Sequence, residues 1–478
     1  MHQIDMKKTI LFLALACCGI LSTSAQQMTL RKGVVLDSLQ VNDTISSESF
    51  ALYLPKKFEL DSRWPVLFLF NMEGKGKHVM QPFLQAAEHQ NYILAASNSV
   101  NDTLSLTQNV LIASRMINQV LNILPVDSRR IYTGGMDTGG TFASVMPVVS
   151  KNIKGIISVG GGIANVDVLA PDSPFQFIGI ANINEYSSIE MEASESLLNN
   201  LRFSNQLFKY EKNTKPLPMY LIDFGLQIFV LNAMAKGEVV KDMEYVNSAY
   251  RQNLRVIDAL IKEKKLLHAY DFANEIMEVF RVHLDVSEIK ASQKLLRKDK
   301  EYKAMKRLAS NYKFKEELLQ EDYDYAIYED VATYNFNNLG WWAYQMQEIK
   351  KFQASTIRFE HQMGNRLKDF VDHLVNKNIR QLKEEETLDE EGLSFLYMLN
   401  TITEPTDHEA YVEVISLSSK IEDYDTALFY LEELLKTGFK DKQQLYDIPD
   451  TALLRISPEY NALMLKYLKE ARYDIKEQ

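Results

Sequence analysis

The sequence predicts an α/β domain, with a mostly parallel sheet flanked by helices, followed by an all-α helical-repeat domain. In the first half, apolar strand-like runs alternate with helical segments, which is the pattern of a parallel α/β sheet. From residue 239 onward only amphipathic helical segments follow. The chain has 478 residues, and 46% of them are hydrophobic, enough apolar mass for two cores. We therefore expect three parts, residues 1–25, 26–238 and 239–478.

The first 25 residues have the pattern of a secretory signal peptide. Lys7 and Lys8 precede a short apolar run, and small residues lead to an expected cleavage after Ala25. This pattern predicts an exported protein, periplasmic or secreted, with no transmembrane span in the mature chain. Cys17 and Cys18, the only cysteines, lie in this segment, so the alternative is a lipoprotein signal in which one of them is acylated.

The strand-like runs of the first domain are of two kinds. Residues 34–39 and 49–54 are expected to be antiparallel lead-in strands, because Pro55 closes the second run. The later runs are continuously apolar, as expected for strands buried on both faces of a parallel sheet; they are residues 64–70, 92–97, 130–133, 155–159 and 175–180. Helices are expected at residues 82–89 and 107–124, with a closing helix at residues 226–234.

A sharp strand-to-helix turn is predicted at residues 129–141. There a short β-rich run meets paired glycines and then a run of small residues with helical character. Residues 135–139, Gly-Met-Asp-Thr-Gly, resemble the Gly-x-Ser-x-Gly nucleophile elbow of α/β-hydrolases, with Asp137 where the serine stands. The glycines let the backbone bend tightly and leave the central side chain exposed.

Further segments around this turn extend the resemblance over roughly residues 49–236. Their order resembles secreted bacterial α/β-hydrolases of the polyhydroxybutyrate-depolymerase and feruloyl-esterase type. The segments are Tyr-Leu-Pro at 53–55, Trp-Pro-Val-Leu-Phe-Leu-Phe at 64–70, a glycine-rich loop, Ala-Ser-Asn at 96–98, Arg-Ile-Tyr at 130–132 and Ile-Ile-Ser-Val-Gly-Gly-Gly at 156–162.

The resemblance implies a nucleophile, an acid and a histidine in that chain order, with backbone amides for an oxyanion. Asp137 occupies the nucleophile position, and Glu185 is the nearest match to the acid. Lys212 stands in the run where the histidine is expected. The oxyanion-loop candidates are Gly74, Lys75, Gly76 and Thr138.

The glycine-rich loop at residues 71–78 allows two interpretations. In the functional one, Lys75 and Lys77, with His78, face Asp137 and form a cationic pocket that pairs with its carboxylate. In the other, the loop's glycines are only turn residues.

Histidine is absent from the interval where the resemblance places the catalytic base. After the signal segment, histidines stand at 78, 89, 268, 283, 361, 373 and 408, so none lies between Asp137 and residue 238. The ordinary general base is therefore missing, and we expect a non-catalytic protein that binds a partner or ligand. The alternative is a divergent esterase in which Asp137 is the nucleophile and Lys212 or His78 serves as the base.

Several other classes of function are not expected. A formal net charge of −11, with lysines interleaved among acids, lacks the basic footprint of a nucleic-acid binder. The sequence contains no zinc, EF-hand or His-Glu-x-x-His pattern, so no metal site is predicted. Gly160–Gly162 lacks the context of a phosphate-binding loop or dinucleotide fingerprint, so no cofactor is expected. A small ester or acyl group remains the candidate ligand at the elbow.

The second half predicts helices at residues 243–264, 266–282, 287–296, 300–320, 338–352 and 356–383, with shorter ones beyond. Residues 338–344 and 423–439 resemble helices of tetratricopeptide repeats, and residues 445–460 resemble a degenerate terminal repeat. Trp341 and Trp342 are expected to pack in the core. Stacked helix pairs form extended grooves, so this half is expected to bind a protein or peptide partner.

Overall fold

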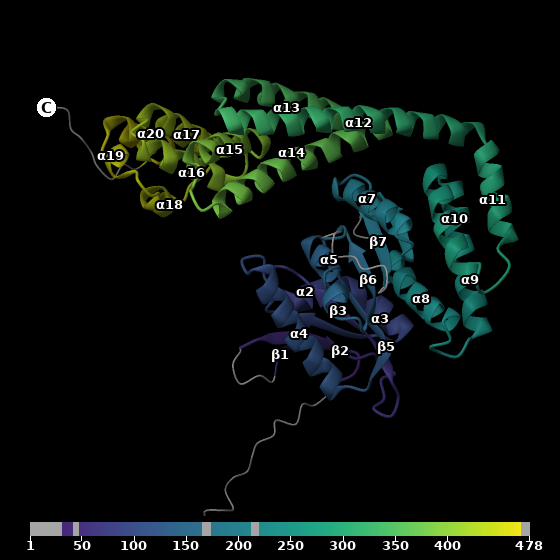
Figure 1. The fold of residues 1–478 in the computed structure, drawn as a ribbon. Helices are drawn as coiled ribbons and strands as arrows, with labels where there is room; N and C mark the ends of the chain where they lie inside the picture. The colour runs from purple at the N-terminus through teal and green to yellow at the C-terminus, as the bar shows by residue number, and fades with distance from the viewer. Residues whose placement is uncertain (1–30, 42–46, 165–173, 212–218, 470–478) are drawn as a thin grey trace, which may run out of the picture.

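The computed structural model describes residues 31–41, 47–164, 174–211 and 219–469 (Figure 1). The predicted signal segment, with Cys17 and Cys18, lies outside the described residues, and so does Lys212. No helix in the described ranges is long and apolar enough to cross a membrane.

An eight-stranded mixed sheet forms the centre of the first half. Its strand order is β1-β2-β4-β3-β5-β6-β7-β8. β2 pairs antiparallel with both β1 and β4. The six neighbouring strands β4, β3, β5, β6, β7 and β8 are parallel to one another. The strands are β1 (Val35–Gln40), β2 (Ser49–Tyr53), β3 (Trp64–Phe70), β4 (Ile93–Ser97), β5 (Val126–Met136), β6 (Ile153–Val159), β7 (Gln176–Asn182) and β8 (Asn205–Tyr210).

Helices cover both faces of this sheet, because parallel strands must be joined by crossover connections. One buried cluster joins the sheet to α4 (Leu106–Ile123), α5 (Thr138–Ala143), α6 (Met146–Val149) and α7 (Ser187–Asn200). The cluster on the opposite face contains residues of α2 (Gly76–Met80), η1 (Gln81–Phe83), α3 (Leu84–Gln90) and α8 (Met219–Ala235). This is an α/β-hydrolase-like arrangement, and it confirms the predicted fold class.

The elements of the first half that are additional to those expected from the sequence include α7 and β8. α7 is rich in serine and glutamate and has few apolar residues, so its helical periodicity is weak. β8 ends in Lys209 and Tyr210, which are only half-buried. β8 is positioned by pairing with β7 at the edge of the sheet, and α7 packs on the face of the sheet beside these two strands.

The core of the first half continues past residue 238. α9 (Met243–Lys262) and α10 (Leu266–Phe280) place Val246 and Phe272 in the same buried cluster as Ile178 of β7 and Phe224 of α8. The ring of Phe272 lies 5.6 Å from that of Phe208 in β8. These two helices therefore form an outer layer on the α/β domain.

The remaining helices form an arm that extends over the α/β domain (Figure 1). The three long helices α12, α13 and α14 run side by side and lead to the shorter helices α15–α20. The bounds are α11 (Ser287–Lys298), α12 (Lys300–Thr333), η2 (Phe336–Asn338), α13 (Leu339–Gln353), α14 (Arg358–Glu384), α15 (Glu390–Thr403), α16 (His408–Lys420), α17 (Tyr424–Lys436), α18 (Lys442–Asp447), α19 (Ala452–Arg455) and α20 (Pro458–Leu468).

The arm has its own buried core. α12 continues to Thr333, past the expected end at residue 320, because no glycine or proline interrupts it. Trp342 is fully buried in this core, and Trp341 packs against it partly buried, as expected. The tetratricopeptide-like character of these helices stays a prediction.

Candidate functional site

The turn between β5 and α5 has the backbone geometry of an elbow. Asp137 is exposed and has φ +50° and ψ −125°, a conformation that an L-residue other than glycine rarely adopts. A Cβ atom at Gly139 would lie 2.2 Å from the carbonyl oxygen of Phe70. A Cβ atom at Gly135 would lie 2.5 Å from the carbonyl carbon of Gly139. The strand and the helix can meet this closely only because both positions are glycine.

The Asp137 carboxylate lies over the end of β6. Its Oδ1 atom would be 2.7 Å from a Cβ atom at Gly160, which has φ +77°. The Asp137 amide donates to the carbonyl oxygen of Val159 at 2.7 Å. Thr138 is exposed and is the first residue of α5, where a helix offers no internal acceptor for the amide.

Tyr210 lies near this carboxylate and also near Glu185. Glu185 follows β7, and its Oε1 atom accepts a hydrogen bond from the Asn182 side chain at 2.6 Å. Tyr210 ends β8; burial, and then the carboxylates of Glu185 and Asp137, raise its pKa to about 12. The phenol of Tyr210, which the sequence alone does not single out, thus lies within electrostatic reach of both the predicted nucleophile and the predicted acid position.

Tyr210 stands near the position where the resemblance places the catalytic histidine. With its pKa raised to about 12, its hydroxyl stays neutral near pH 7, so it can donate a hydrogen bond but is not a general base there. The sequence signal for Tyr210 is its place at the end of the last strand. That strand is identified by its pairing with β7, which the sequence does not show.

The amides of the glycine-rich loop after β3 are hydrogen-bonded within the loop and to Asn98. The amides of Gly74 and Lys75 donate to the carbonyl and side-chain oxygens of Asn71, and the amide of Gly76 donates to the Asn98 side chain. The Lys75 ammonium lies 2.7 Å from Glu73, and both side chains are exposed. In this arrangement the three amides already have acceptors.

Lys75 also lines a hollow of about 670 Å³ beside the end of β4, together with Lys77 and His78. Asp37 and Glu73 lie in the same lining, so its charges are mixed. The functional interpretation, in which the loop's cations pair with Asp137, stays a prediction.

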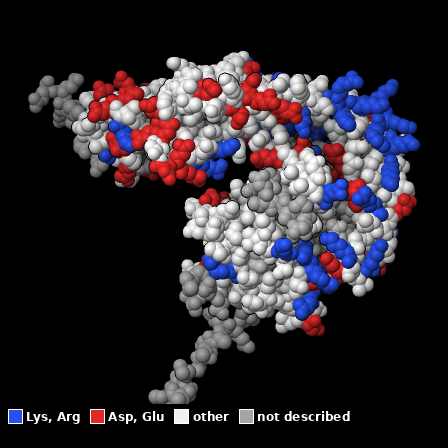
Figure 2. Space-filling model, viewed as in Figure 1, with Lys and Arg blue, Asp and Glu red and all other residues white. Residues whose placement is uncertain are grey.

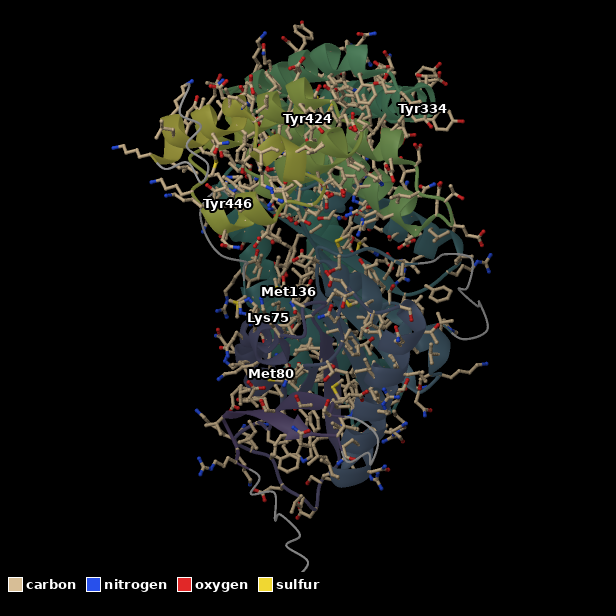
Figure 3. All side chains as sticks on the ribbon, turned by 90° about the vertical axis from the view of Figure 1, so that its left-hand side faces the viewer. Lys75, Met80, Met136, Tyr334, Tyr424 and Tyr446 are labelled. Atoms are coloured by element: carbon tan, nitrogen blue, oxygen red, sulfur yellow. The ribbon has the colours of Figure 1, made fainter. Side chains whose placement is uncertain are left out.

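The helical arm is fastened over the loops that follow β7 and β8; we call these contacts the junction. Arg366 of α14 donates to the carbonyl oxygen of Ile183 at 2.6 Å and pairs with buried Glu316 of α12. The amide of Tyr186, next to Glu185, donates to Asp369 of α14 at 3.3 Å. The acid position is thus held against the arm. Figure 3 shows Met136, the neighbour of Asp137, on the α/β domain below the arm.

One histidine of the second half reaches the junction. Burial, and then the guanidinium of Arg358, lower the pKa of His268 in α10 to about 4, although Glu211 opposes this shift. His268 is therefore neutral at pH 7. In the chain it lies beyond the expected first domain, so its position in the sequence does not indicate a base for the elbow.

The chemistry available at the elbow is that of two carboxylates, a neutral phenol and the first amides of a short helix. A carboxylate nucleophile forms an ester, which turns over only if a base activates water. Among the described residues, no group of three or more His, Cys, Asp or Glu side chains is arranged to hold a metal ion.

Comparisons with known proteins bear only on the fold. No protein-family model matches the chain, and no curated protein matches it. Among solved structures, one of two esterases from Rhizomucor miehei superposes with a TM-score of 0.36 at 11% identity, over 42% of this chain and 85% of that one. A putative dienelactone hydrolase from Klebsiella pneumoniae gives 0.32 at 12% identity, over 37% and 85%.

A protein longer than this one also superposes on part of the chain. A putative dipeptidyl aminopeptidase IV from Bacteroides ovatus gives a TM-score of 0.34 at 15% identity, over 41% of this chain and only 35% of that one. At these identities and TM-scores the similarity carries no information on chemistry.

Proposed function

We propose that this is an exported, non-catalytic protein with an α/β-hydrolase-like domain, which binds a protein or peptide partner through its helical arm. The observation that carries the proposal is the composition of the elbow. Asp137 stands where a nucleophilic serine is needed, and Tyr210, a neutral phenol, lies near the position of the base. A site of this composition can bind a small ester or acyl group but lacks the means to turn it over.

Partner binding is supported by the exposed apolar side chains of the arm. Ile421 and Phe429 of neighbouring helical segments are 70% and 58% exposed. Exposed apolar side chains that lie together in a hollow are typical of an interaction site.

A second candidate function is a divergent esterase with Asp137 as its nucleophile. One observation favours it. The strained backbone of Asp137, with φ +50° and an exposed carboxylate, is the geometry in which an elbow presents a reacting group.

Turnover of short-chain aryl esters separates the two candidates. The mature protein, Asp137→Ser and Asp137→Ala are incubated with p-nitrophenyl acetate and butyrate, and release of nitrophenol is followed. We expect no turnover above the buffer rate in any form, because restoring the serine does not supply a base. Turnover in the native protein that Asp137→Ala abolishes would refute the non-catalytic proposal and establish the esterase.

Export is tested separately by mass spectrometry of the protein recovered from the producing cells. We expect a mature chain that begins at Gln26. A chain that begins at Cys17 or Cys18 and carries acyl groups would instead support the lipoprotein alternative.

A further inference from the structure

We propose that a groove on the arm binds a peptide segment that is both cationic and apolar. The groove lies where α13, α15, α16 and α17 meet and has a volume of about 750 Å³. We call it the acidic groove; its apolar lining includes Leu339, Met398, Ile421 and Phe429, and its acids are Glu390, Glu391, Asp423 and Asp425. The inference rests on the proposed function, in which the arm captures a partner, and it names the chemistry of that partner.

Apolar side chains line the acidic groove without being covered. Ile421 is the C-cap residue of α16 and is 70% exposed, while Phe429 of α17 is 58% exposed. The ring of Phe429 meets that of Tyr430 edge-on, with centroids 5.2 Å apart, so the face of one aromatic ring stays available. Covering these side chains would remove apolar surface from water, which favours binding of an apolar ligand.

The charges of the acidic groove all have one sign. Four carboxylates line it, and no lysine or arginine is among the described residues that do so. The Asp423 carboxylate caps α17 by accepting a hydrogen bond from the Thr426 amide, and Glu390 pairs with Lys420 at its edge. Glu391 and Asp425 are both exposed, in the first turns of α15 and α17.

This combination selects the ligand class. Lysine and arginine carry an apolar stem and a charged head, so they can pack on Ile421 and Phe429 while the head meets Glu391 or Asp425. A guanidinium can also stack on an aromatic face. An acidic ligand would be repelled, and a purely apolar one would leave the carboxylates without partners.

The groove continues along α17, which favours a peptide over a small cation. Asp425 and Phe429 also line a second hollow of about 370 Å³ that reaches α20. Glu432 and Glu459 add two further carboxylates there, and Lys466 pairs with Glu432 at 2.7 Å. An extended chain can occupy both hollows at once. Figure 3 places Tyr424, which stands between Asp423 and Asp425, in the arm, well above Lys75 of the α/β domain.

The test uses a fluorescein-labelled peptide of three Lys-Leu-Arg-Phe repeats and the full mature protein. Fluorescence anisotropy gives the dissociation constant at low and at physiological salt. We expect binding that weakens with salt, and about tenfold weaker binding to Glu391→Gln/Asp425→Asn and to Phe429→Ser, since interface charges and aromatic anchors act at this scale. Peptides with Glu for the cations, or Ser for Leu and Phe, should not bind.

Glu409→Gln/Glu244→Gln is the matched control. Both residues are exposed acids in first helical turns, and neither lines the groove. The control removes the same net charge, so it should bind the peptide as the native protein does. Equal weakening in the control would show non-specific attraction to an acidic protein and overturn the proposal. Circular dichroism confirms that each variant is folded before its affinity is compared.

A second copy of the chain is the competing occupant. Figure 2 shows lysines and arginines gathered at the end of the molecule where α11 and α12 meet, far from the acidic part of the arm. Exposed Leu295 stands among the cations of α11, which are Lys290, Lys294, Arg297 and Lys298. Self-association that is lost in both Phe429→Ser and Lys294→Glu, without peptide binding, would assign the groove to a second copy and overturn the proposal.

Failure of this inference is distinct from failure of the proposed function. If the protein turns over no ester and does not bind the peptide through the groove, only the assignment of the groove is refuted. If it turns over esters through Asp137, the non-catalytic function is refuted, whether or not the peptide binds.

Discussion

Arg358 of α14 forms a bidentate ion pair with Glu211, the residue that follows β8. Its Nε and Nη2 atoms lie 3.1 Å and 2.8 Å from the two carboxylate oxygens, and Gln362 donates to the same carboxylate at 2.8 Å. Burial acts to raise the pKa of Glu211, but Arg358 and Gln362 outweigh it and lower the pKa. The contact joins the arm to the strand that ends beside the elbow.

We expect Arg358→Ala to lower the free energy of unfolding by about 2 kcal/mol, because it leaves the largely buried Glu211 without its cation. Urea unfolding followed by circular dichroism measures the change. Lys264→Ala is the control, since its pair with Glu301 is exposed on both sides and should contribute little to stability. Equal losses in the two variants would mean that the junction pair is no stronger than a surface pair.

Asp330 organises the end of α12. Its carboxylate is buried and accepts hydrogen bonds from the Trp342 indole at 2.8 Å, from Asn338 at 2.7 Å and from Asn335 at 3.0 Å. Asp330→Ala leaves these donors without an acceptor, so we expect a loss of about 3 kcal/mol in the stability of the arm. Tryptophan fluorescence during unfolding reports it. Asp324→Ala, an exposed acid on the same helix, should change stability little; a comparable loss there would contradict the assignment.

Gly139 and Gly340 differ in the space available for a Cβ atom. Gly139→Ala should destabilise the protein by about 3 kcal/mol, because its Cβ atom would meet the Phe70 carbonyl oxygen at 2.2 Å. Gly340→Ala lies in α13 with nothing within 4 Å of its Cβ atom, so it should stabilise by about 0.5–1 kcal/mol. Differential scanning calorimetry of both variants measures the two signs. A Gly139→Ala protein as stable as the native one would contradict the close approach of this position to the Phe70 carbonyl oxygen.

Glu275 of α10 should make stability depend on pH. Burial, and then the Glu195 and Asp271 carboxylates, raise its pKa from 4.5 to about 8. Between these values the folded state binds more protons than the unfolded state, so stability falls as pH rises, with a slope of at most about 1.4 kcal/mol per pH unit. The lowered pKa of His268, about 4, acts with the opposite sign, but only below pH 6.5.

The window from pH 6.5 to 8 excludes the contribution of His268. Burial raises the pKa of Asp372 to about 7, so that carboxyl acts with the same sign in the lower part of the window, and a variant of Glu275 is needed to separate the two. Glu275→Gln should raise the melting temperature at pH 7.5 and flatten its decline over this window, because the amide carries no charge to desolvate. Glu278→Gln changes an exposed acid on the same helix and should leave the pH profile as it is. An unchanged profile in Glu275→Gln would indicate that Glu275 is ionised in the folded protein at neutral pH.

Much of the first half follows from local sequence. The continuous apolar runs of β3 and β4 can be satisfied only by burial on both faces of a sheet, and Gly135 and Gly139 allow the tight turn that presents Asp137. The lack of a histidine between Asp137 and residue 238 is likewise a fact of the sequence alone. These features involve residues close together in the chain, where periodicity and backbone preference carry the information.

The contacts that define the site and the groove were decided by tertiary structure. Tyr210 lies close enough to Asp137 and Glu185 for both carboxylates to raise its pKa because β8 pairs with β7. Glu211 meets Arg358 because α14 begins beside the loops that follow β7 and β8. The acidic groove likewise gathers Leu339, Glu391 and Phe429 from separate helices. No local pattern specifies such pairs, because their closeness depends on how whole elements bury their apolar faces against one another. That packing exists only in the folded chain.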